Sequence, residues 1–75
     1  MTQAELFEPR VDECAPLAAD HLRKAEQYRR AAEVFASRGW LTLEAEHRRK
    51  AAEHEAESEC LAMYHDLLLR SGVRA

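Results

Sequence analysis

The segment ASRGWLT, residues 36–42, separates two long stretches of helix-forming sequence. Ala, Glu, Arg and Leu dominate both stretches, and these four residue types favour helix. Gly39 is one of only two glycines in the 75-residue chain, and glycine readily takes the left-handed conformation that ends a helix. We therefore predict a helix over about residues 12–38, a turn at 39–41 and a second helix over about 42–70.

A connection this short forces two helices to run antiparallel. The predicted fold class is therefore all-α, an antiparallel helical hairpin of two long helices. Residues 1–11 are predicted to be a flexible N-terminal arm, and residues 71–75 a C-terminal tail. No stretch alternates apolar and polar residues for long enough to predict a strand.

Folding the chain about Gly39 and Trp40 pairs residues whose numbers sum to about 80. Apolar residues then repeat every three or four positions on both helices, with a large side chain opposite a small one at several levels. The predicted core inside the hairpin consists of Ala18, Ala25, Tyr28, Ala32, Phe35, Ala45, Ala52, Ala56, Cys60, Met63 and Leu67.

The second predicted helix carries another stripe at helical spacing, opposite the first. With Trp40 at one end, we predict it to be a partner or dimer interface that contains Trp40, Leu43, His47, His54, Leu61, His65 and Leu68. The simplest partner is a second copy, which would complete a four-helix bundle and supply the core that a short chain lacks. Periodicity alone does not decide which stripe faces the other helix of the same chain.

Charge and composition narrow the classes of function. The chain has 14 acidic and 11 basic residues and a net charge of −3, and glutamates interleave its basic segments, so we expect no nucleic-acid binding. No apolar run approaches the roughly 20 residues of a membrane span, and we expect no signal peptide. Two cysteines are too few for a disulfide scaffold, which predicts reduced thiols and a cytoplasmic location.

Metal binding is the main chemical alternative. Glu44 and His47 form a Glu-x-x-His pair, the spacing used in di-iron carboxylate bundles. His54 and His65 lie too far along the same helix to join His47 at one ion. The histidines are thus open to metal binding or to pH sensing, but the expectation is that the protein needs no cofactor.

The segment AAEVFASRGWLTLEAEHRRKAAEHE, residues 31–55, resembles a tetratricopeptide helix pair. Ala32, Phe35, Gly39 and Ala51 lie near the small and aromatic positions of that family, whereas Glu44 stands where it has an alanine. The resemblance covers about one repeat, and a stable array needs three or more. It implies a packed helix pair.

These patterns predict a small protein-binding module without catalytic activity, since two helices form no water-poor pocket for a nucleophile and its base. We expect a homodimeric regulator, adaptor or inhibitor that occupies a surface of a larger protein. The composition is typical of a bacterial or phage regulator. The alternatives are a metal-binding bundle and a structural subunit of a larger assembly.

Overall fold

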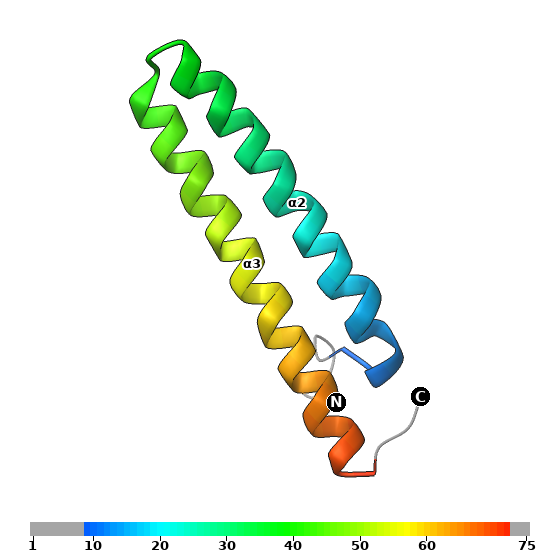
Figure 1. The fold of residues 1–75 in the computed structure, drawn as a ribbon. Helices are drawn as coiled ribbons and strands as arrows, with labels where there is room; N and C mark the ends of the chain where they lie inside the picture. The colour runs from blue at the N-terminus through cyan, green and yellow to red at the C-terminus, as the bar shows by residue number, and fades with distance from the viewer. Residues whose placement is uncertain (1–8, 73–75) are drawn as a thin grey trace, which may run out of the picture.

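The computed structural model describes residues 9–72, which form two helices side by side (Figure 1). α2 spans Val11–Ser37 and α3 spans Leu41–Arg70. The helices run antiparallel and pack against each other, so the chain is an all-α helical hairpin. Residues 1–8 of the predicted arm and 73–75 of the predicted tail lie outside the described residues. Neither described helix has a stretch that is long and apolar enough to cross a membrane.

The turn between the helices follows the chemistry predicted for Gly39. Its φ is +75°, and its N–H donates to the carbonyl of Ala36 at 3.1 Å. The N–H of Trp40 donates to the carbonyl of Phe35 at 2.9 Å, which completes a Schellman motif. The Trp40 and Phe35 rings also stack, with centroids 6.0 Å apart. The turn is therefore fixed by backbone hydrogen bonds and by one aromatic contact.

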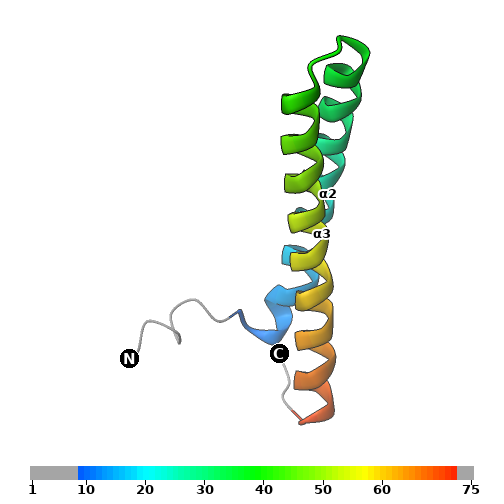
Figure 2. The same ribbon diagram turned by 90° about the vertical axis from the view of Figure 1, so that its left-hand side faces the viewer.

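The hairpin is a single layer, one helix thick. In the view of Figure 2 one helix lies behind the other, and within residues 9–72 no third helix or strand covers the pair. A stable domain usually has at least two packed layers around a core. Each side of the contact between the helices is consequently open to solvent.

Small residues fill the centre of the contact between α2 and α3. Ala25, Ala32, Ala51 and Ser58 are buried, and Ala25 and Ala32 are fully so. Val11 and Cys14 are buried at the end of the hairpin far from the turn. Alanine and serine let two helices approach closely, but they remove little apolar surface from water.

The structure shows that α3 is rotated relative to our prediction. Residues of the supposed outer stripe face α2: His47, His54, Leu61, His65 and Leu68 are all half-buried. The prediction was wrong for the core residues of α3, which are exposed instead: Ala45, Ala52, Ala56, Cys60, Met63 and Leu67. On α2, the predicted residues Ala18, Ala25, Tyr28, Ala32 and Phe35 are buried or half-buried.

The rotation has a physical reason in the spacing of the two stripes. The stripe that faces α2 keeps steps of three and four residues without a gap from Glu44 to Leu68, which matches a helix seam. The alanine stripe is interrupted between Ala45 and Ala52, where Arg48 and Arg49 stand. His54 also contacts the rings of His21 and Tyr28 inside the hairpin, whereas a prediction from hydropathy treats histidines as surface residues.

Candidate functional site

Six ring side chains form a continuous series along the contact between the helices. Each ring touches the next, with centroid separations between 4.9 and 6.0 Å. We call this series the aromatic flank, and it consists of His21, Tyr28 and Phe35 from α2, Trp40 from the turn, and His47 and His54 from α3.

The flank lies to one side of the hairpin's centre line. At about 100° per residue, Tyr28 and Phe35 are offset by about 60° and 80° from the fully buried Ala25. On α3, His54 and Leu61 have nearly the same offsets from the buried Ala51. Because offsets of equal sign on antiparallel helices point to the same side, the large side chains gather on one face of the layer.

Solvent reaches the flank over much of its length. Trp40 is 49% exposed and Leu43 is 40% exposed, while the other rings are half-buried. Leu61 and Leu68 continue the same side toward the end of α3 and are half-buried too. A series of large side chains that is half covered by its own chain is a typical surface for a partner.

The closest contact in the flank joins two histidines. Nδ1 of His21 lies 2.9 Å from Nδ1 of His54, across the gap between the helices. A hydrogen bond at this distance needs a hydrogen on one ring and a lone pair on the other. No sequence pattern predicted this pair, because the two residues are 33 positions apart and only the register of the hairpin brings them together.

Glu44 and His47, the predicted metal pair, have other partners. Glu44 Oε2 accepts a hydrogen bond from Nε of Arg48 at 2.9 Å, and Nδ1 of His47 lies 2.9 Å from the carbonyl oxygen of Leu43. The structure brings these two side chains to no common ligand. Among residues 9–72, no group of three or more His, Cys, Asp or Glu side chains is placed to hold a metal ion.

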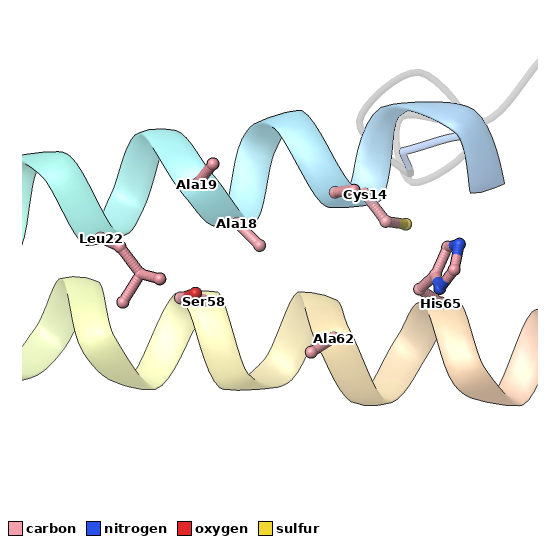
Figure 3. Close-up of a pocket in the computed structure, with 8 residues that line it drawn as sticks. Cys14, Ala18, Ala19, Leu22, Ser58, Ala62 and His65 are labelled. Carbon is pink, nitrogen blue, oxygen red and sulfur yellow. The ribbon is translucent and has the colours of Figure 1, made fainter.

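An apolar groove of about 400 Å³ lies near the open end of the hairpin (Figure 3). Cys14 and Leu22 line it from α2, and Ser58, Ala62 and His65 line it from α3. Burial raises the pKa of the Cys14 thiol, and the charges of Glu13 and Asp12 raise it further. A reactive cysteine needs a lowered pKa, so this environment favours an inert thiol.

The outer side of α3 carries the exposed alanine stripe. Its large members are Leu41, Met63, which is 67% exposed, and Leu67, which is 58% exposed. A shallow apolar depression is lined there by Ala56, Cys60, Met63 and Leu67. This surface faces away from α2 and is separate from the aromatic flank.

The basic side chains in the middle of the hairpin are paired with carboxylates. Arg29 bridges the helices to Glu55, and pairs within one helix hold the others: Arg23, Lys24, Arg30, Arg48, Arg49 and Lys50. The Arg38 guanidinium lies over the Trp40 ring, 5.3 Å from its centroid. Exposed ion pairs of this kind contribute about 0–1 kcal/mol each to stability. They leave a mixed-charge surface between the apolar ends of the hairpin.

No protein-family model, curated protein or solved structure matches this chain. The geometry of the aromatic flank and of the outer side of α3 therefore carries the functional argument.

Proposed function

We propose that this chain is a non-catalytic protein-binding module that pairs with a second copy of itself through the aromatic flank. The supporting observation is that the six rings of the aromatic flank, with Leu43, Leu61 and Leu68 beside them, lie on one open face of a single layer. Two such faces brought together by a twofold axis would give a four-helix bundle, in which the face that carries the aromatic flank and these leucines meets the same face of the second copy.

The end of α3 carries further apolar surface, beyond the aromatic flank. From Cys60 to Leu69 only His65 and Asp66 are polar, so this segment is apolar around most of the helix. α2 covers one side of it, and Met63, Leu67 and Leu69 remain exposed. A helix that is apolar on all sides is normally surrounded by other elements.

Pairing through the flank would leave the outer side of α3 free in both copies. We propose that this second surface, with Leu41, Met63 and Leu67, binds a larger protein, as a regulator, adaptor or inhibitor would. A structural role in a larger assembly would use the same surface, and would give particles larger than a dimer.

A set of matched variants tests the proposal by sedimentation velocity. Leu43→Glu and Leu61→Glu each place a charge on the face that carries the aromatic flank, and each should convert the dimer to monomer. Val34→Glu changes a residue of similar exposure, 51%, on the opposite side of α2 and should leave the dimer intact. Dimers that persist in both flank variants, with helical content unchanged, would contradict the proposed interface.

A further inference from the structure

The four histidines of the chain all lie along the contact between α2 and α3, and each is half-buried. They differ in what they touch. His47 lies against the Leu43 carbonyl, and His65 lines the apolar groove with Cys14. Only His21 and His54 bring two ring nitrogens face to face.

We propose that His21 and His54 together bind one divalent transition-metal ion, with Cu²⁺ and Ni²⁺ favoured. Imidazole nitrogens bind such ions at about 2.0–2.1 Å. Two neighbouring ligands of a square-planar or tetragonal site then lie about 2.9 Å apart, because they subtend about 90° at the ion. The two Nδ1 atoms are 2.9 Å apart already. A tetrahedral zinc ion would need them to open to about 3.3 Å.

Metal binding would replace the hydrogen that the two rings share. The donor ring would change tautomer, its proton passing through water from Nδ1 to its own Nε2. Each Nδ1 would then present a lone pair to the ion, and both imidazoles would stay neutral. The Tyr28 ring stacks on His54 with planes 10° apart, which holds that imidazole in place without occupying its Nδ1. Two residues from opposite helices would thus form one chelate that links α2 to α3.

Water would fill the remaining positions around the ion. No third His, Cys, Asp or Glu among residues 9–72 joins the pair. Two protein ligands favour an exchangeable ion over a permanent structural one. Cu²⁺ should bind more tightly than Ni²⁺ or Zn²⁺, as the usual order of stability predicts.

This site goes beyond the proposed dimer, since both ligands come from one chain. It also replaces the predicted metal pair, Glu44 and His47, whose side chains are engaged elsewhere. The Leu43→Glu variant, expected to be monomeric, should keep the site. Loss of pairing and loss of metal binding are therefore separable.

The test is a titration of chelator-free protein with CuCl₂ and NiCl₂ at pH 7.5, followed by thermal unfolding and, for copper, by electron paramagnetic resonance. We expect one ion per chain, a spectrum with two imidazole nitrogens bound to copper, and a rise in Tm of about 5–10 °C at tenfold excess over Kd. His21→Gln and His54→Gln should each weaken binding at least tenfold. His47→Gln and His65→Gln are the matched controls, and both should bind copper as tightly as the unmodified protein does. All four variants share the same N-terminal amine, so copper bound there would not distinguish them.

Two results would overturn the site. One is unchanged copper affinity in the double variant His21→Gln, His54→Gln. The other is a spectrum of the unmodified protein that shows fewer than two imidazole nitrogens, a reading that does not depend on whether any variant folds.

Discussion

The Tyr28 ring lies nearly parallel to the His54 imidazole, with centroids 5.5 Å apart and planes at 10°. It also touches His47, which lies seven residues or about two turns earlier on α3, with centroids 5.6 Å apart. One residue of α2 thereby contacts two turns of α3. This relationship sets the rotation of α3 about its own axis and turns its histidines toward α2.

Replacing Tyr28 by alanine should lower the free energy of unfolding by about 2 kcal/mol, because it removes a half-buried ring and two ring contacts. Tyr28→Phe should lie within about 0.5 kcal/mol of the unmodified protein, since no described residue hydrogen-bonds the Tyr28 hydroxyl. Urea unfolding at fixed protein concentration measures both. Equal losses in the two variants would show that the hydroxyl, and not the ring, matters.

Ala32→Leu should destabilise the hairpin by about 1–3 kcal/mol, because Ala32 is fully buried where the helices approach and a larger side chain forces them apart. Ala52→Leu makes the same change on the exposed side of α3, where we expect a difference within about 0.5 kcal/mol. Thermal unfolding of the pair checks the rotation of α3. The reverse order of effects would place the alanine stripe inside the hairpin.

Gly39→Ala should cost about 1 kcal/mol of stability, because the residue has a φ of +75°. An added Cβ would meet no atom within 4 Å, so the cost comes from the backbone conformation alone. Gly39→Asn should cost less, since asparagine tolerates the left-handed region better. Chemical unfolding of the two variants gives the comparison, and a larger loss for asparagine would count against this account of the turn.

Cys14 and Cys60 should react with a thiol reagent at very different rates. Cys60 is exposed, whereas Cys14 is buried and its thiol has a raised pKa, mainly because of that burial. A raised pKa means that the folded chain holds the proton more tightly than the unfolded chain. The stability that this difference in pKa provides is fully present below the pKa of the thiol in the unfolded chain, near 9. It is lost as pH rises through the pKa of the thiol in the folded chain.

Mass-resolved labelling with an aromatic disulfide at pH 8 measures the two rates, with Cys60→Ser isolating the signal of Cys14. We expect one fast site and one that reacts only after local opening. Rapid labelling of Cys14 in folded Cys60→Ser protein would show that this end of the hairpin is open.

The turn and the helix ends could be predicted from sequence because they depend on local chemistry. Gly39 determines the first helix end, and the bounds of α2 and α3 differ from those predicted by one residue at most. The face of α3 that packs on α2 could not be predicted, since both of its stripes have helical periodicity. Which stripe packs on α2 depended on ring contacts such as that of Tyr28 with His54, and a hydropathy pattern contains no information about such contacts.

The contact between His21 and His54 also could not be predicted from the sequence. Their contact requires two conditions at once. The register of the hairpin must be right to within one helical turn, and α3 must be rotated so that His54 faces α2. A prediction that placed His54 on the outside could not bring it to His21. His54 was predicted as a member of a helical stripe, but nothing in its spacing linked it to His21.

Native mass spectrometry of the chelator-free protein, recorded from low to high micromolar concentration, tests the central claim most directly. Our account predicts a dimer of about 17 kDa, twice the 8.6 kDa of the chain, that dissociates on dilution and is absent in Leu43→Glu. A monomer at every concentration would contradict pairing through the aromatic flank.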